Sequence, residues 1–374
     1  MKSAFIVIDN LRIGGFQRLA LDQAYCLSER GYRVNLLVLT DESKISESNF
    51  ILIEQPILSK LNVQIGWVGN NRVSQLIALR KILVFAQKDF LLISHSLRAT
   101  TLLRVSRLFM KNKPTIITTI HQLPTLSHKR QRFQRFFYAQ FTDLLYAYSC
   151  AVQSDWKSQT QSNIIFRKLL FLKEIKVLRN GIYLPRLPNP SCQDKLNAPP
   201  RLIFLGRNTA WKGLETFFQI VSQPKLSDFE ILFLVPFGDA IQLESLPDYV
   251  RNKVTIISGK TIASYKPRVG DVHIYPANYG AAAHFIESVS LNCLELASLG
   301  IPTLLTRSGL GTWPDLEEFG IFQETDWKSM DLIVEQVLTL TKKVYSPTEI
   351  DLIRQLIDIN NQIDLYENSL REQA

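Results

Sequence analysis

The chain has 374 residues, 46% of them hydrophobic and 21% charged. This length exceeds one ordinary core and predicts two folded domains, and the apolar content excludes a disordered chain. The sequence also predicts no membrane-spanning helix, because no run approaches about 18 apolar residues, and no zinc site, because the four cysteines are scattered without a CxxC pair.

The formal net charge of +9 is unevenly divided along the chain. Residues 1–190 contain 27 Lys and Arg against 11 Asp and Glu, whereas residues 191–374 contain 16 against 23. A basic first half indicates an anionic partner for that half. A phospholipid surface, a lipid diphosphate and nucleic acid are the candidates at this point.

The first 40 residues predict the opening of a doubly wound α/β domain. They predict a buried strand over 4–9, a Gly turn over 11–15, a helix over 16–31 that Gly31 caps and a second strand over 32–39. The apolar core of the first strand is too short for a signal peptide. Later strands of the same domain are predicted over 63–68, 91–94, 115–119, 148–152 and 175–178.

A proline-rich segment over 184–200 interrupts this pattern and indicates a linker. A strand over 201–206 and a helix from about Leu214 then open a second α/β pattern. Its further strands are predicted over 230–235, 254–258, 272–276 and 303–306, and its helices over 327–343 and 347–370. The chain is therefore predicted to begin with a Rossmann-like domain over 1–183, followed by the linker over 184–200. A second Rossmann-like domain over 201–346 and a C-terminal helix over 347–374 follow, and the helix is predicted to pack back toward the first domain.

Two carboxylates, Glu287 and Glu295, have seven residues between them, in a stretch that ends at Thr306. The pattern predicts a loop, a helix over 288–297, a Gly turn and a strand. In such a helix eight positions correspond to roughly 12 Å of rise, near the distance from hexose to ribose in a nucleotide sugar. The carboxylates would accept hydrogen bonds from sugar hydroxyls, and the helix N-terminus would face the diphosphate. The alternative is an ordinary helix with two solvated glutamates.

Loops at the carboxyl ends of strands bind ligands in doubly wound sheets. Arg207 and Lys212 lie in the loop after the first strand of the second domain, where two cations would neutralise a diphosphate. Gly14 and Gly15 follow the first strand of the chain and would let backbone N–H groups approach a phosphate, with Arg18 facing the same cleft. Surface cations and a simple tight turn are the alternatives, and no GxGxxG pattern supports a dinucleotide dehydrogenase.

His121 ends the apolar segment over 115–121. A histidine just past a strand faces the ligand cleft or serves the core. In a cleft it would hydrogen-bond a sugar hydroxyl or assist a proton transfer. His95 occupies a similar position on the preceding strand.

A basic and aromatic stretch covers residues 128–141. At helical spacing it predicts a helix that lies on an anionic membrane surface, with aromatic rings at the headgroup level. Its membrane-facing or acceptor-facing residues are predicted to be Lys129, Arg130, Arg132, Arg135 and Phe136. A helix half buried in its own domain is the alternative, and no RNA-binding or DNA-binding signature supports a nucleic-acid partner.

Together these motifs resemble the retaining glycosyltransferases of family 4, which have the GT-B fold. The resemblance extends over roughly residues 4–345 and is carried by Gly14-Gly15-x-x-Arg18, His121, the VLRNGI segment over 177–182, Arg207-x4-Lys212 and Glu287-x7-Glu295 followed by LASLGIP. It implies an α/β chain with two Rossmann-like domains that face each other across a cleft.

The resemblance implies a role for each of these residues. Arg207 and Lys212 would bind the donor diphosphate and steady the departing nucleotide, and Glu295 would accept hydrogen bonds from the ribose. Glu287 would hold donor-sugar hydroxyls, and His121 would contact the donor sugar near its primary hydroxyl. The remaining donor-binding residues would be Gly14, Gly15, Arg18, Ser288, Ser290 and Leu291. Family members often have glycine at two of these positions where this chain has serine, a departure that bears on the identity of the sugar.

These expectations define a retaining, metal-independent hexosyltransferase without a cofactor. It would move a sugar from a nucleotide-sugar donor, with a UDP-sugar expected, to a lipid-linked or polysaccharide acceptor in cell-envelope or capsular glycan synthesis. We expect a cytoplasmic protein bound peripherally to the inner face of the cell membrane, with no nucleic-acid partner. The alternatives are a nucleotide-sugar epimerase or phosphorylase on the same fold, and a non-catalytic glycosyltransferase-like partner protein.

Overall fold

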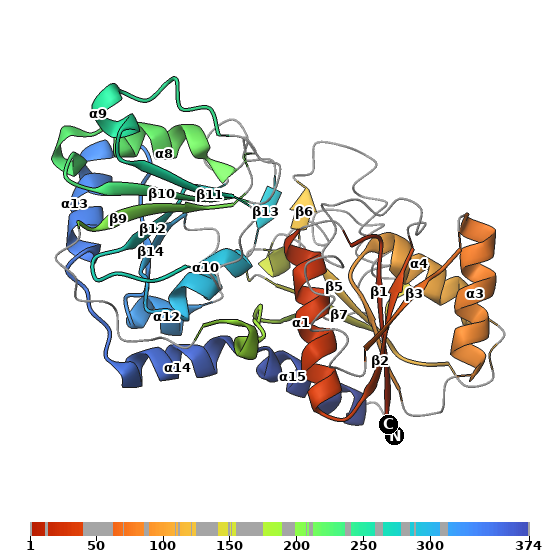
Figure 1. The fold of residues 1–374 in the computed structure, drawn as a ribbon. Helices are drawn as coiled ribbons and strands as arrows, with labels where there is room; N and C mark the ends of the chain where they lie inside the picture. Colours follow the sequence, from red (N-terminus) through yellow and green to blue (C-terminus); the bar gives the residue numbers. More distant parts are fainter. Residues whose placement is uncertain are drawn as a thin grey trace. The chain divides into compact units, whose positions relative to one another are not determined.

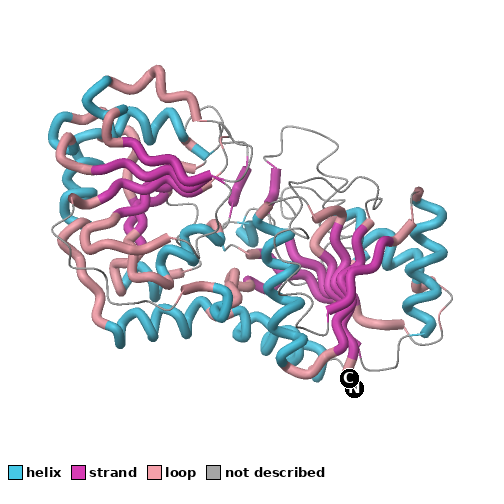
Figure 2. Tube along the Cα trace, in the orientation of Figure 1, coloured by secondary structure: helices cyan, strands magenta, loops and turns pink. Residues whose placement is uncertain are grey.

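The computed structural model describes the residues that carry two sheets and their flanking helices (Figures 1 and 2). These residues are 2–11, 14–39, 63–69, 71–85, 90–108, 110, 113–120, 122–124, 141–148, 150, 152–154, 175–188, 199–206, 208, 212–235, 241–258, 265–277, 285–287, 289–306 and 313–372, with only the backbone described at 85, 122–124, 258 and 285–287. They form two compact units: unit 1 comprises Met1–Tyr183 with Ile359–Ala374, and unit 2 comprises Leu184–Asp358. Within these residues, no helix has both the length and the apolar character that crossing a bilayer requires.

Among its described residues, unit 1 contains a seven-stranded parallel sheet in the order β3-β2-β1-β4-β5-β7-β8. The strands are β1 (Ser3–Ile8), β2 (Arg33–Val38), β3 (Val63–Trp67), β4 (Phe90–Ser94), β5 (Ile116–Ile120), β7 (Leu144–Ala147) and β8 (Ile175–Val177), and β6 (Gln122–Pro124) is a further short strand. The helices are α1 (Gly15–Glu29), α3 (Arg72–Phe85), α4 (Leu97–Ser106) and α15 (Ile359–Arg371). Figure 1 shows α1 on the opposite side of this sheet from α3 and α4, and α15 packs against α1.

The sheet of unit 1 is covered on both faces, as parallel sheets require. In β1, Phe5 and Val7 belong to the apolar cluster beneath α3 and α4. Ala4, Ile6 and Ile8 alternate with them and are also buried, so they face the side of α1. The continuous apolar run predicted as the first strand therefore forms a fully buried central strand.

Unit 2 repeats this architecture: its described part contains a six-stranded parallel sheet in the order β11-β10-β9-β12-β14-β15. The strands are β9 (Arg201–Leu205), β10 (Glu230–Val235), β11 (Val254–Ser258), β12 (Val272–Tyr275), β14 (Thr303–Leu305) and β15 (Phe322–Glu324), and β13 (Phe285–Glu287) lies outside this sheet. The helices are α8 (Leu214–Val221), α9 (Asp248–Arg251), α10 (Leu291–Ala297), α12 (Pro314–Glu318), α13 (Met330–Leu340) and α14 (Pro347–Ile357), with 3₁₀ helices η2 (Leu184–Arg186) and η4 (Pro224–Leu226).

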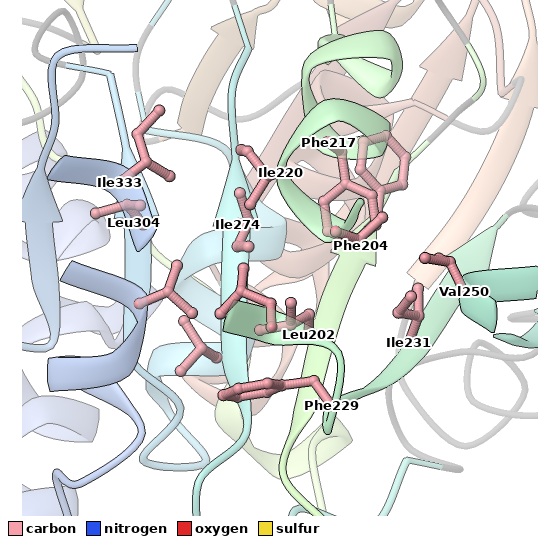
Figure 3. Packing of buried hydrophobic residues seen from close by; sticks show 14 of the residues in the cluster. Leu202, Phe204, Phe217, Ile220, Phe229, Ile231, Val250, Ile274, Leu304 and Ile333 are labelled. Carbon is pink, nitrogen blue, oxygen red and sulfur yellow. The ribbon is translucent and has the colours of Figure 1, made fainter. Parts of the chain in front are cut away.

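An apolar core fixes the sheet of unit 2 against α8 and α13 (Figure 3). Phe204 of β9, Phe217 of α8 and Phe233 of β10 pack with ring centroids 5.3 to 5.9 Å apart. Complete burial of each such ring contributes about 1.5–3 kcal/mol. Lys212, which lies two residues before α8, contacts Tyr275 at the carboxyl end of the neighbouring strand β12.

The predicted fold class, α/β with two Rossmann-like domains, is confirmed. In both sheets the chain builds outward from the first strand in one direction and then returns to build in the other. The strand order therefore reverses between β1 and β4 in unit 1 and between β9 and β12 in unit 2. Ligands of doubly wound sheets bind outside the carboxyl ends of the strands at such a reversal.

The predicted strand over 148–152 is wrong, because β7 ends at Ala147 and the described residues 152–154 are helical. The cause is pairing with the neighbouring strand. Leu144 to Ala147 pair with Ile117 to Ile120, the last described residue of β5.

The single helix predicted over 347–370 is also wrong, because the structure has two helices separated by Asp358. This residue has extended backbone angles (φ −65°, ψ 131°), and the N–H of the next residue, Ile359, donates a hydrogen bond to the Ile182 carbonyl at 3.0 Å. As a result α14 belongs to unit 2 and α15 belongs to unit 1.

A buried hydrogen-bond network joins α15 to unit 1. The Nε2 atom of His95 donates to Gln23 Oε1 at 2.7 Å, and its Nδ1 atom accepts from the Thr119 hydroxyl at 3.1 Å. Gln23 Nε2 donates to Gln362 Oε1 of α15 at 3.1 Å, and Gln362 donates to the Tyr148 hydroxyl at 2.8 Å. His95 is therefore a structural histidine held in its neutral form.

We expect the stability of the protein to fall in acid partly because of His95. Burial lowers the pKa of its imidazole to about 3, below the ordinary value of about 6.5. Between these pH values the imidazole is protonated in the unfolded chain but not in the native state. The free energy of unfolding therefore decreases as pH falls from 6.5 toward 3, by at most about 1.4 kcal/mol per pH unit.

Urea unfolding of the wild type and of His95→Gln at pH 7 and pH 5 tests this. The wild type should lose about 2 kcal/mol more than the variant over this interval, because glutamine does not titrate. Equal losses would show that His95 does not couple folding to pH.

Candidate functional site

The carboxyl ends of β9 and β12 lie side by side at the reversal of strand order in unit 2. The two strands are parallel neighbours, with Val272 opposite Leu202 and His273 opposite Ile203. Lys212 lies in the connection from β9 to α8, and Tyr275 is the last residue of β12. Two polar side chains are thus placed at the edge where doubly wound sheets bind ligands.

Lys212 and Tyr275 are in direct contact. Their exposed fractions are 7% and 5%. The Lys212 ammonium donates a hydrogen bond to the Tyr275 hydroxyl and lies 4.7 Å from the centroid of its ring. A buried ammonium requires such partners. The site therefore contains a cation whose position is set by a phenol.

His273 lies on the same strand beneath this pair. Its ring centroid is 5.7 Å from that of Tyr275, and its Nδ1 atom lies 3.2 Å from the Thr303 hydroxyl oxygen. Burial and, secondarily, the charge of Lys212 lower the pKa of the imidazole to about 3. His273 is consequently neutral, and Lys212 supplies the positive charge of this group of side chains.

Gly213 explains how Lys212 reaches Tyr275. Its φ is +75°, and a Cβ at this position would lie 2.5 Å from the Pro276 carbonyl oxygen. The backbone at the start of α8 therefore approaches the end of β12 more closely than any other residue would permit. The sequence analysis did not name Gly213, although a glycine directly after a candidate lysine is a usable signal.

Glu295 is placed at the same edge through α10. Asn292 of α10 donates a hydrogen bond to the Leu205 carbonyl at the end of β9, at 3.1 Å. Gly206 lies between the side chains of Asn292 and Lys212, since its Cβ would stand 3.8 Å from an atom of each. The structure thus brings Lys212 together with the helix that carries Glu295. The donor-binding roles of both residues stay predictions.

The Glu295 carboxylate is largely buried and has a cationic neighbour. It is 8% exposed, and its Oε1 atom lies 3.8 Å from Arg186 Nη2, whose side chain is 6% exposed. Arg186 belongs to η2, at the start of unit 2 and inside the segment predicted as the linker. The sequence analysis did not name Arg186, and no local pattern indicates that it reaches Glu295.

The predicted helix over 288–297 begins later than expected. Helix α10 starts at Leu291, because Ser290 has extended backbone angles (φ −64°, ψ 144°), and Glu287 is the last residue of β13. The two glutamates are not on one continuous helix, so the estimate of their separation from helical rise does not apply. The expected order of helix, Gly turn and strand is confirmed by α10, Gly300 (φ +74°) and β14.

Unit 1 has a polar pair at its own reversal of strand order. Asp9 follows β1 and Ser96 follows β4, and the Ser96 hydroxyl donates a hydrogen bond to Asp9 Oδ1 at 2.9 Å. Burial raises the pKa of the Asp9 carboxyl, while the Ser96 hydrogen bond and the charge of Arg98 oppose this rise. The sequence analysis overlooked Asp9, whose position directly after the first strand was the available signal.

The predicted phosphate loop of unit 1 is described in part. Gly14 has an extended backbone (φ −173°), and α1 begins at Gly15, where a Cβ would meet no atom within 4 Å. The extended backbone of Gly14 does not require glycine, and packing does not require glycine at Gly15. The Arg18 guanidinium lies 3.8 Å from Asp22 on the next turn of α1. The donor-binding roles of these residues stay predictions.

Several predicted residues lie outside the described part of the chain, and their roles stay predictions too. They are His121, Arg207, Ser288, Lys129, Arg130, Arg132, Arg135 and Phe136. Only the backbone of Glu287 is described. Ser290 and Leu291 are the N-cap and the first residue of α10, and Leu291 is buried.

Comparisons with known proteins define the class of fold. No protein-family model matches the chain, and no curated protein matches it in sequence. Solved structures match it over nearly its whole length, and they have the GT-B fold of glycosyltransferases. The predicted GT-B fold is thereby confirmed, whereas membership of family 4 stays a prediction.

Three of these similar structures show how far the likeness extends. The chain is similar to sucrose-phosphate synthase from Thermosynechococcus elongatus, with a TM-score of 0.69 and 12% identity over 100% of this chain and 99% of that chain. It is similar to WaaG, a glycosyltransferase involved in lipopolysaccharide biosynthesis, with a TM-score of 0.58 and 13% identity over 98% of each chain. It is also similar to an alpha-glucosyltransferase in complex with UDP, with a TM-score of 0.60 and 13% identity over 98% and 100%. At such identities the likeness shows the fold alone.

Replacing Gly213 by alanine should lower the stability of the protein by about 2 kcal/mol or more. Alanine disfavours a positive φ, and its Cβ would collide with the Pro276 carbonyl. Gly15→Ala is the matched control, because open space surrounds that position, and it should change stability by less than about 0.5 kcal/mol. Unfolding midpoints in urea measure both, and equal effects would contradict the close approach of α8 to β12.

Replacing Arg186 by methionine should lower stability by about 3 kcal/mol, because it leaves the buried Glu295 carboxylate without this cation. Arg268→Met is the control: Arg268 lies closer to its partner Glu230, at 2.7 Å, but both side chains are part exposed, so its loss should be under about 1 kcal/mol. Adding Glu295→Gln to Arg186→Met should restore part of the stability. Similar losses for the two arginines in urea unfolding would show that burial does not strengthen the Arg186 pair.

Proposed function

We propose that the protein is a glycosyltransferase that moves a sugar from a nucleotide-sugar donor to a hydroxyl acceptor. The observation that carries this proposal is the arrangement at the reversal point of unit 2, where the Lys212 ammonium and the helix of Glu295 meet at one edge of the sheet. A nucleotide sugar needs both kinds of group, a cation for its diphosphate and a carboxylate for its hydroxyls.

The chemistry follows from where charge develops. When the bond between the sugar and the diphosphate breaks, negative charge increases on the departing phosphate oxygens. A cation held in place before the reaction stabilises that charge without a rearrangement of solvent. Lys212 is placed for this role, with Arg207 as its predicted partner. Glu295 would accept hydrogen bonds from the ribose hydroxyls, which makes binding of the nucleotide specific.

A UDP-sugar is the donor that we propose. One structure similar to this chain is an alpha-glucosyltransferase in complex with UDP. The retaining stereochemistry, the independence of metal ions and membership of family 4 belong to the same proposal and come from the resemblance of the motifs.

The acceptor is proposed on charge. Sucrose-phosphate synthase and WaaG, a glycosyltransferase of lipopolysaccharide biosynthesis, share this fold, so the fold is compatible with very different acceptors. The basic first half of the chain favours an anionic acceptor such as a lipid-linked sugar or a polysaccharide precursor. Peripheral binding to an anionic membrane surface through residues 128–141 stays a prediction.

Nucleotide binding should be detectable as thermal stabilisation. At about 100 times its dissociation constant a ligand adds roughly 2.7 kcal/mol of stability, which raises the midpoint by roughly 5 °C or more. UDP should produce this shift in the wild type, and GDP and ADP should produce less. Glu295→Ala should reduce the UDP shift, whereas Glu318→Ala, at an exposed position on α12, should preserve it.

Product formation separates this proposal from its alternatives. A panel of nucleotide sugars, analysed for transfer, epimerisation and phosphorolysis, should give transfer to an added acceptor or to water. The absence of a midpoint shift with every nucleotide, together with the absence of any product, would overturn the proposed function and favour a non-catalytic partner protein.

A further inference from the structure

The hydroxyl of Tyr275 has no role in the motifs that predicted the donor site, yet it makes the closest polar contact of Lys212 that the structure describes. An ammonium group has three N–H donors, and a phenol oxygen accepts one of them. The contact therefore fixes one N–H direction of Lys212. Two donors remain directed to other partners.

Tyr275 is a rigid partner for a flexible side chain. Its strand, β12, is paired on both sides, with β9 and with β14, and Tyr275 itself stands opposite Leu305. A lysine side chain loses up to about 2 kcal/mol of rotamer entropy when it is ordered. Contact with a phenol fixed in the sheet orders Lys212 before any ligand arrives, so that ligand binding need not supply this free energy.

The residues around the contact between Lys212 and Tyr275 support a role for it in positioning the ammonium. The close approach of Gly213 to Pro276 holds the backbone of Lys212 against the end of β12. His273, directly beneath, is neutral.

We propose that Tyr275 is a positioning residue, whose hydroxyl accepts a hydrogen bond from Lys212 and thereby directs the ammonium toward the diphosphate of the bound nucleotide. This inference rests on the proposed function, because it assigns the partner of the cation in that site. Tyr275 itself would not contact the reacting atoms. Its effect on the ligand passes entirely through Lys212.

Calorimetric titration of Tyr275→Phe with UDP, UMP and uridine tests the proposal, since phenylalanine keeps the ring and removes only the hydroxyl. The affinity for UDP should fall by about tenfold, the size expected for loss of a hydrogen bond to a charged group. The affinity for uridine should not change, because uridine lacks the phosphates that Lys212 would contact. Tyr345→Phe is the control: Tyr345 is another buried tyrosine of unit 2, whose hydroxyl donates to the Gly320 carbonyl at 2.8 Å, and its loss should leave all three affinities unchanged.

A double-mutant cycle shows whether Tyr275 acts through Lys212. Lys212→Met should weaken UDP binding at least as much as Tyr275→Phe, and the double variant should be no weaker than Lys212→Met alone. Additive losses would overturn the positioning role, as would an unchanged UDP affinity of Tyr275→Phe or an equal loss of uridine and UDP affinity.

The outcomes also separate this inference from the proposed function. A wild type that binds none of the three ligands contradicts both. A wild type that binds UDP through Lys212, with Tyr275→Phe unchanged, contradicts the positioning role alone and leaves the donor site in place.

Discussion

The close approach of Gly213 to the end of β12 is the constraint on which the candidate site depends. It requires a left-handed backbone conformation and the absence of a Cβ, and it places Lys212 against Tyr275 at the reversal point of the sheet. The aromatic core around Phe204 and Phe217 holds β9 and α8 on either side of this point. The packing of the core and the position of the cation are therefore consequences of the same chain geometry.

Both charges of the site are largely buried, and each has a partner within unit 2. Lys212 is held by a phenol, and Glu295 lies near the guanidinium of Arg186. Burying a charge without a partner costs several kcal/mol, so these contacts stabilise the fold. They also hold the charges in position before a ligand arrives, which is what stabilisation of a departing diphosphate requires. Under the proposed function, the interactions that maintain unit 2 also prepare it for catalysis.

Unit 1 has the same strand order but a different use of polar groups. At its reversal point, Asp9 and Ser96 form a hydrogen-bonded pair at the end of the sheet. Behind them, His95 and Gln23 belong to a network that joins α15, the last helix of the chain, to this unit. The polar groups at the carboxyl edge of unit 1 therefore combine a part-buried pair with a buried network that attaches the end of the chain.

The motifs predicted that Lys212 and Glu295 lie at one edge of a sheet, because both predictions depended on position relative to strands. A residue just after the first strand of a doubly wound sheet must lie at its carboxyl edge, whatever the details of packing. Arg186 and Tyr275 could not be found in this way. Each acts through a partner distant in sequence, and nothing in the neighbouring residues indicates which partner it meets. For Glu287 and Glu295 the local pattern was misleading. Their spacing was interpreted as helical rise, but Glu287 ends strand β13 and helix α10 begins only at Leu291.

The sequence by itself determined the two doubly wound sheets, since apolar runs of strand length and the glycines between them are local features that a single segment displays. It also predicted the strand ends at which the proposed ligand-binding residues lie. Only the tertiary structure decided where β7 ends, where the last helix divides at Asp358 and which side chains hold Lys212 and Glu295. These outcomes depend on pairing and burial between segments far apart in the chain, such as Ile182 with Ile359, and local pattern contains no information about such contacts.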